Sequence, residues 1–117
     1  MRMSLWMLFV VAVMAMEQTG TASEVQTAEV MSDVEWRDLA TKRNCLLCHE
    51  MKRDALGPSL KDIAAEYSNE ADAEEMLLKK VYAGGVGKWG NTMMPSQAPP
   101  ANEEEIKALI RYMLLLK

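Results

Sequence analysis

Cys45-Leu46-Leu47-Cys48-His49 is the stretch of the 117-residue sequence that decides the fold. Cys-x-x-Cys-His is the attachment motif of c-type haem. Two thiols at this spacing, on the last turn of a helix, face the same way and can each add across one vinyl group. The histidine that follows is carried under the ring, where a ring nitrogen can bind iron. His49 is the only histidine of the chain. We therefore predict one haem c, bonded to Cys45 and Cys48 and ligated by His49.

Other chemistries fit these residues less well. A thioredoxin-like redox pair needs a βαβ context, and no such pattern surrounds Cys45 and Cys48. A structural zinc site needs four ligands, and two cysteines with one histidine leave it incomplete. A disulfide or dithiol motif is the remaining alternative, and it gives His49 no role.

Residues 1–22 are predicted to be a signal peptide. Arg2 is followed by an uncharged, mostly apolar run of 13 residues, 4–16. This run is shorter than the roughly 20 residues that span a bilayer, but it fits the apolar region of a secretory signal. Small residues permit cleavage after Ala22 or after Ala15, and an uncleaved membrane anchor is the alternative. Because haem is attached to c-type proteins outside the cytoplasm, we expect a periplasmic protein.

The rest of the chain is expected to form one domain, residues 32–117, after a flexible N-terminal segment, residues 23–31, that is polar and lacks apolar periodicity. The net charge of −4 is unchanged by removal of the leader, which carries one charge of each sign. An acidic domain argues against nucleic acid as a partner. The 95 residues after the leader are few for a self-sufficient core, so a covalently held macrocycle should supply much of the interior.

The domain is predicted to be all-α, because no segment alternates with period two over a useful length. Ser32-x-x-Glu35 is a capping box for the first helix, which is expected to carry the haem motif at its end. The predicted helices cover about 33–44, 59–67 and 70–82, with a last helix that Asn102 caps. The last helix has an apolar stripe typical of burial on one face: Ile106, Leu109, Ile110, Met113 and Leu114.

Residues 84–101 are predicted to be a long loop, because they contain four glycines and three prolines. Long ordered loops in compact domains are usually functional. This loop carries Met93 and Met94, the best candidates for a second axial ligand. The chain has no second histidine, and the other methionines of the domain lie on helix faces, ahead of the first helix or beside the haem motif. Pro95 restricts the backbone after Met94, but spacing alone does not decide between the two methionines.

From residue 33 to residue 117 the sequence resembles the small bacterial class I cytochromes c, especially the short monohaem carriers of the denitrification type. Besides the haem motif, the resemblance rests on Gly57-Pro58-Ser-Leu60-Lys-Asp-Ile63-Ala-Ala, Gly84-Gly-Val-Gly-Lys-Trp89-Gly-Asn-Thr-Met-Met94-Pro95 and Leu109-Ile-Arg-Tyr112-Met. It implies a class I cytochrome c fold, with about four short helices wrapped around one covalently bound haem. The family places its ligand methionine five residues after a tryptophan and just before a proline, which implies Met94 as the ligand.

The resemblance also implies roles for two other residues. Pro58 would pack beside His49, and a neighbouring carbonyl would accept the imidazole N–H. The indole N–H of Trp89 would face a haem propionate; ordinary core packing is the alternative. Gln97 stands where such carriers often have an asparagine that binds the methionine sulfur, and Lys88 helps to make the loop more polar than is usual.

The implied function is that of a periplasmic electron carrier that is not an enzyme. A six-coordinate iron passes single electrons between redox proteins with little rearrangement, and His/Met ligation raises its potential. The alternative is a haem-bearing subunit held permanently in a dehydrogenase or reductase. An enzyme or gas sensor fits less well, because the sequence offers no distal His or Arg pair for peroxide chemistry.

The expected partners are redox proteins that the sequence does not name, and a membrane only if the leader stays uncleaved. Lysines near the haem edge are candidates for steering such partners, although an ordinary solvated surface explains most of them equally well. These lysines are Lys42, Lys52, Lys61 and Lys88.

Overall fold

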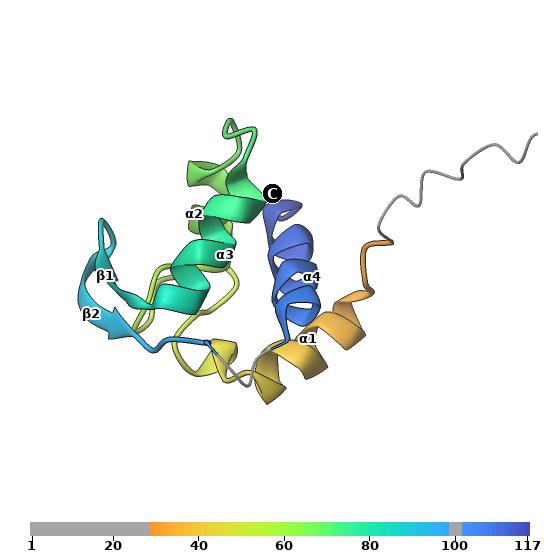
Figure 1. The fold of residues 1–117 in the computed structure, drawn as a ribbon, viewed down its shortest axis with the longest axis horizontal. Coiled ribbons are helices and arrows are strands. Elements are labelled where there is room, and N and C mark those ends of the chain that lie inside the picture. The colour runs from red at the N-terminus through yellow and green to blue at the C-terminus, as the bar shows by residue number, and fades with distance from the viewer. Residues whose placement is uncertain (1–28, 99–101) are drawn as a thin grey trace, which may run out of the picture.

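The computed structural model describes residues 29–98 and 102–117, which contain four α-helices and one small sheet (Figure 1). The helices are α1 (Asp33–Lys42), α2 (Leu60–Glu66), α3 (Ala73–Ala83) and α4 (Glu103–Leu114), with a 3-10 helix, η1, at Cys45–Leu47. Strands β1 (Gly85–Gly87) and β2 (Gly90–Met94) pair antiparallel. The prediction of a mostly helical domain with four short helices is confirmed. The predicted signal peptide and most of the segment 23–31 lie outside the described residues.

Side-chain caps fix the residues at which two helices begin. The Ser32 hydroxyl accepts the Glu35 N–H, and the Glu35 carboxylate accepts the Ser32 N–H at 2.9 Å, so the predicted capping box is present. The Asn102 side chain accepts the Glu104 N–H at 2.9 Å and starts α4. These bonds satisfy N–H groups that the first turn of a helix leaves open.

The first helix ends earlier than predicted. It stops at Lys42, and Asn44 adopts the left-handed conformation with φ 61°. An α-helix cannot continue through this backbone geometry. The haem motif therefore begins on the separate turn η1, with Cys48 and His49 just after it, and does not lie on the last turn of α1.

The third helix also differs in detail from the prediction. It begins at Ala73 and not near residue 70, because the preceding residues form turns. Its buried face consists of Ala73, Leu77 and Leu78, whereas Met76, expected on the apolar face, is 40% exposed.

A β-hairpin occupies the first part of the predicted loop. Gly85 pairs with Met94 and Gly87 pairs with Gly90. Gly85 and Gly90 have φ values of 92° and 115°, which other residues rarely adopt. A segment so rich in glycine has no apolar alternation, which is why its pattern predicted a loop.

Helix α4 lies at the centre of the fold and contacts the other three helices. In Figure 1 it is the blue helix, with α3 beside it and α1 crossing near its start. The predicted stripe is confirmed, with Leu114 only partly buried and the other four residues buried: Ile106, Leu109, Ile110 and Met113. No helix within the described residues is long and apolar enough to cross a membrane.

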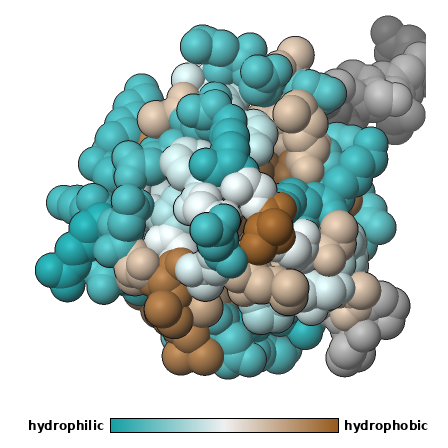
Figure 2. Space-filling view, turned by 90° about the vertical axis from the view of Figure 1, so that its left-hand side faces the viewer, coloured by the Kyte–Doolittle hydropathy of each residue, from teal (hydrophilic) through white to brown (hydrophobic). Residues whose placement is uncertain are grey.

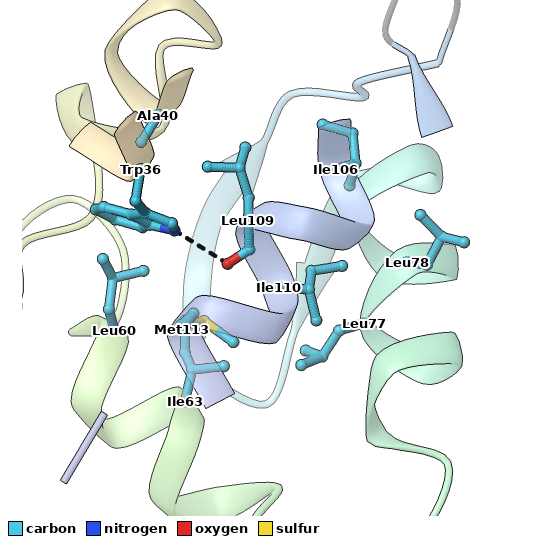
Figure 3. Close-up of a cluster of buried hydrophobic side chains, with 10 residues drawn as sticks. All are labelled: Trp36, Ala40, Leu60, Ile63, Leu77, Leu78, Ile106, Leu109, Ile110 and Met113. Atoms are coloured by element: carbon cyan, nitrogen blue, oxygen red, sulfur yellow. Dashed lines mark hydrogen bonds between the residues drawn. The ribbon is translucent and has the colours of Figure 1, made fainter. Parts of the chain in front are cut away.

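Trp36 attaches α1 to α4. Its side chain is 2% exposed, and its indole N–H donates to the Leu109 carbonyl at 3.0 Å (Figure 3). The ring also stacks on Tyr112, with centroids 5.1 Å apart. The Tyr112 hydroxyl in turn donates to Asp33 at 2.6 Å. The first and the last helix of the domain are thereby held together.

Candidate haem site

A cavity of about 400 Å³ brings the predicted site residues together. Its wall contains all seven of them: Cys45, Cys48, His49, Pro58, Trp89, Met93 and Met94. Much of the remaining wall consists of core side chains from all four helices: Trp36, Leu60, Ile63, Leu77, Ile106, Leu109, Ile110 and Met113. An apolar wall with a few convergent polar groups is typical of a cofactor site. Its free thiols, imidazole and thioethers form a donor set that fits a covalently attached haem.

The haem motif is held by its own backbone. The N–H groups of Cys48 and His49 both donate to the Cys45 carbonyl, at 3.2 and 3.0 Å. Both thiols are free and partly exposed at the cavity, so the alternative disulfide is not formed. Burial raises the pKa of the Cys45 thiol, which therefore stays protonated at neutral pH.

The imidazole of His49 has a fixed orientation. Its Nδ1 lies 2.7 Å from the Pro58 carbonyl oxygen, so an N–H at Nδ1 donates to that carbonyl. This bond leaves Nε2 as the nitrogen available to a metal. A Cβ placed on Gly57 would lie 2.8 Å from Cε1 of His49. The absence of a side chain at Gly57 is therefore what allows Pro58 to approach the ring.

Pro58 is positioned by the start of α2. The next residue, Ser59, is fully buried, and its hydroxyl accepts the Asp62 N–H at 3.0 Å and donates to the Asp62 carboxylate at 2.7 Å. The Ser59 N–H donates to Asp54 at 2.9 Å. The helix cap therefore holds the carbonyl that orients His49.

Exposure distinguishes the two candidate methionines. Met93 is 72% exposed, whereas Met94, the next residue on β2, is partly buried. Both side chains contribute to the cavity wall. The more buried thioether is the better placed of the two to stay at a dry site.

The chain after Met94 is fixed against the end of α3. A Cβ on Gly84, which has φ 65°, would lie 2.5 Å from the Met94 carbonyl oxygen and 2.6 Å from the Ser96 nitrogen. The Ser96 hydroxyl donates to the Tyr82 carbonyl, and the Gln97 N–H donates to the Val81 carbonyl at 3.0 Å, so both bonds attach this segment to α3. This close approach determines where β2 presents Met94.

The turn of the hairpin carries Trp89 and leaves it 42% exposed at the cavity. Val86, on β1, is also exposed, and the Lys80 ammonium donates to its carbonyl at 2.9 Å. On the face that carries the hairpin, brown apolar groups reach the surface in two places among teal and white ones (Figure 2).

Three contacts could not be seen in the sequence. Gly57 and Gly84 stand in segments that carry the family resemblance, but nothing in the sequence indicated that each lies against a candidate ligand. The pairing of Lys88 with Glu66 is a contact between distant segments that no local pattern encodes.

The cytochrome c family model matches residues 35–117. Cytochrome c-551 of Allochromatium vinosum is 45% identical over 78 residues, which are 65% of this chain and 80% of the relative. Cytochrome c-552 of Nitrosomonas europaea is 41% identical over 80 residues, 68% of this chain and 77% of the relative.

Solved structures share the fold. The crystal structure of wild-type Nitrosomonas europaea cytochrome c552 aligns with a TM-score of 0.65 and 41% identity, over 69% of this chain and 99% of that one. The class 1 cytochrome MtoD from Sideroxydans lithotrophicus aligns with a TM-score of 0.64 and 32% identity, over 74% of this chain and 98% of that one. The chain therefore belongs to the cytochrome c family, as a small class I monohaem cytochrome with one covalently attached haem c.

Proposed function

We propose that the protein is a periplasmic carrier of single electrons between redox proteins, with His49 and Met94 as the axial ligands of its haem iron. The observation that carries this proposal is the cavity, which gathers two free thiols, an oriented imidazole and a partly buried thioether within an apolar wall. When bound, haem supplies a one-electron redox couple at its iron.

The chain's own residues divide the work of holding the group. Cys45 and Cys48 form thioether bonds that keep it in place. His49 binds through Nε2, with Pro58 accepting its other N–H. This second bond raises the basicity of the imidazole as a ligand. Trp89, which lines the cavity and is 42% exposed, would donate its indole N–H to a propionate of the haem.

Met94 determines the kind of chemistry. A protein thioether bound to the iron would leave no site there for a substrate, so the protein would transfer electrons and catalyse no reaction of its own. The apolar wall keeps water away and reduces rearrangement when the charge changes. The partners meet the exposed side of the cavity in small, short-lived complexes.

The proposed location follows from the N-terminal sequence. A signal peptide over residues 1–22 would export the chain to the compartment in which haem is attached to Cys-x-x-Cys-His motifs. The cytochrome domain would then occupy residues 32–117. Mass spectrometry of the exported protein should find one haem, retained after acid acetone treatment, and a chain without residues 1–22.

The decisive experiment for the ligands uses two neighbouring methionines. Met94→Ala should abolish the near-infrared sulfur-to-iron charge-transfer band and lower the reduction potential, because a soft thioether that favours ferrous iron is lost. Met93→Ala should retain both properties. The reverse pattern would identify Met93 as the ligand, and an absent band in the unmutated protein would overturn thioether ligation.

A further inference from the structure

Lys88 connects the hairpin turn to the end of α2 by two contacts, and a third contact joins it to Trp89 within the turn. Its ammonium forms an ion pair with Glu66, the last residue of α2. It also lies 5.3 Å from the centre of the Tyr67 ring and 5.7 Å from the centre of the Trp89 ring. Both distances are within the roughly 6 Å over which a cation is attracted to an aromatic face. We call Glu66, Tyr67, Lys88 and Trp89 the Lys88 clasp.

The clasp lies at the wall of the haem cavity. Tyr67, Lys88 and Trp89 all line this cavity, as does Met94 on the same hairpin. The hairpin is thus held at three places: at its base, where Gly84 lies against the chain after Met94, at β1, where Val86 accepts a hydrogen bond from Lys80 on α3, and at its turn, where Lys88 meets α2.

The hairpin has little apolar packing of its own. Four of the five residues of β2 are exposed, and only Met94 is partly buried. β1 is equally short of packing, with only Gly85 partly buried. Polypeptide with few buried apolar contacts opens locally at low free energy. Contacts at the turn therefore have a large influence on how long the hairpin stays in place.

The charge of Lys88 suits this position. Its hydrogen bond to Glu66 raises the pKa of the Lys88 ammonium, which stays charged throughout the physiological range. The last turn of α2 contains no basic residue of its own, and a cation at the C-terminal end of a helix is favourable. The ion pair is about half exposed, so added salt should weaken it.

We propose that Lys88 is a positioning residue, which holds the β1–β2 hairpin against α2 and so limits how often the Met94 thioether leaves the iron. This role rests on the proposed function, since Met94 must be the ligand. In this role Lys88 stabilises the ligand loop of the carrier and does not steer partners.

The test is the rate at which imidazole replaces the sixth ligand of the ferric holoprotein. At high imidazole concentration the observed rate approaches the rate at which the thioether leaves. Lys88→Met keeps the chain length but removes the charge, and we expect it to raise this limiting rate about tenfold, the combined effect of one exposed ion pair and its ring contacts. Lys88→Arg should return the rate to within about twofold of the original, because guanidinium keeps the charge and stacks on aromatic rings.

A second variant and a matched control isolate the clasp. Glu66→Gln should raise the rate less than Lys88→Met, since the ring contacts remain. Lys79→Met removes an ammonium that lies 3.5 Å from Glu75 on α3 and does not line the cavity, and it should leave the rate unchanged. Salt should accelerate thioether release in the unmutated protein but have little effect on Lys88→Met.

An unchanged limiting rate in Lys88→Met would overturn the proposal. So would an equal rise in Lys79→Met, or an effect of Lys88→Met confined to electron exchange with charged partners, which would make Lys88 a steering residue. The charge-transfer band of the unmutated protein distinguishes a failure of the Lys88 proposal from a failure of the Met94 assignment. If the band is present and the rate is unchanged, only the clasp is wrong; if the band is absent, the assignment of Met94 is wrong as well.

Discussion

A glycine lies in close contact with each proposed axial ligand or with the backbone that carries it. A Cβ on Gly57 would press on the His49 ring, and a Cβ on Gly84 would press on the backbone that follows Met94. Glycine allows another segment to approach this closely, and at Gly84 it also adopts a backbone conformation with φ 65° that side chains resist. Two residues without side chains thus determine where a ring and a thioether are presented.

Gly57→Ala tests the first of these contacts. The added methyl would lie 2.8 Å from Cε1 and 3.1 Å from Nδ1 of His49, so the ring must shift and its bond to Pro58 must weaken. We expect the free energy of unfolding to fall by about 1–3 kcal/mol, as for other overpacked sites. The reduction potential should rise, because a more weakly hydrogen-bonded imidazole donates less charge to iron.

Denaturant titration and redox titration of the holoprotein measure these two effects. Gly87→Ala is the matched control, since its Cβ would meet only the flexible end of Lys80, at 3.3 Å. If Gly57→Ala behaves like Gly87→Ala in both measurements, the close contact with His49 is not a constraint.

Gly84→Ala tests the second contact. The methyl would meet backbone atoms at 2.5 and 2.6 Å, which cannot move without displacing Met94. We expect a loss of roughly 3 kcal/mol or more in unfolding free energy, from backbone strain and from the clash together. The charge-transfer band should weaken or disappear.

Gly85→Ala separates strain from clash. Gly85 also has a positive φ, of 92°, but a Cβ there would meet no atom within 4 Å. It should lose only about 1–3 kcal/mol and keep the band. Equal spectra for the two alanine variants would show that Gly84 does not position Met94.

Among the elements, ion pairs fix α4 against its neighbours. Arg111 on α4 forms two bonds with Glu74 on α3, at 2.8 and 2.9 Å. Arg43, just after α1, pairs with Glu105 in the first turn of α4. The Arg43 guanidinium is the main cause of a lowered pKa for the Glu105 carboxyl.

This pair makes the stability of the domain depend on pH. Because the pKa of Glu105 is lower in the folded state than in the unfolded state, the unfolded state binds more protons as the solution becomes acidic. The contribution is complete above the ordinary glutamate pKa and is lost as pH falls through the lower, folded value. Arg43→Met should therefore reduce stability at pH 7 and flatten its decline in acid.

Urea titrations at a series of pH values between neutrality and about pH 3 measure this slope. The lowered pKa values of Asp33 and Glu35 remain in the variant, so some acid sensitivity persists. Lys79→Met, on an exposed pair within α3, should keep the original slope. An unchanged slope in Arg43→Met would mean that the pair does not couple α1 to α4.

Elements whose causes are local could be predicted from the sequence. The Ser32 capping box and the apolar stripe of α4 depend on residues three or four apart, so their patterns are visible without the fold. The break at Asn44 and the hairpin depend on positive φ values, which asparagine and glycine can adopt but which their presence in a sequence does not require. The Lys88 clasp joins segments about 20 residues apart by long-range packing, which periodicity does not report.

In the candidate site, too, only the residues with a local sequence pattern could be predicted. The haem motif is contiguous, so chemistry and spacing were enough to identify Cys45, Cys48 and His49. Met93 and Met94 could not be separated by spacing, because adjacent residues in a loop have equal reach. Their different exposure, 72% for Met93 against partial burial for Met94, appears only once β2 is formed.

On the scale of the whole molecule, the cavity and the core share one surface. Eight of the ten residues in the buried core cluster also line the cavity of about 400 Å³. Removing the group that fills it would expose much of the interior to water. A domain this small has little other apolar burial to compensate.

We therefore expect folding of the domain to require haem. A chain with Cys45→Ser and Cys48→Ser, expressed without haem, should show a far-ultraviolet circular dichroism signal well below that of the holoprotein and no cooperative unfolding transition. Cooperative melting of this apo form, with native helix content, would contradict the idea that haem completes the core.

Carbon monoxide binding to the reduced holoprotein shows whether the sixth position of the iron is closed, because carbon monoxide needs an open position on the iron. If the Met94 thioether occupies that position, the unmutated protein should bind carbon monoxide poorly at neutral pH, while Met94→Ala should bind it readily. Tight binding by the unmutated protein would contradict the assignment of a closed, six-coordinate electron carrier.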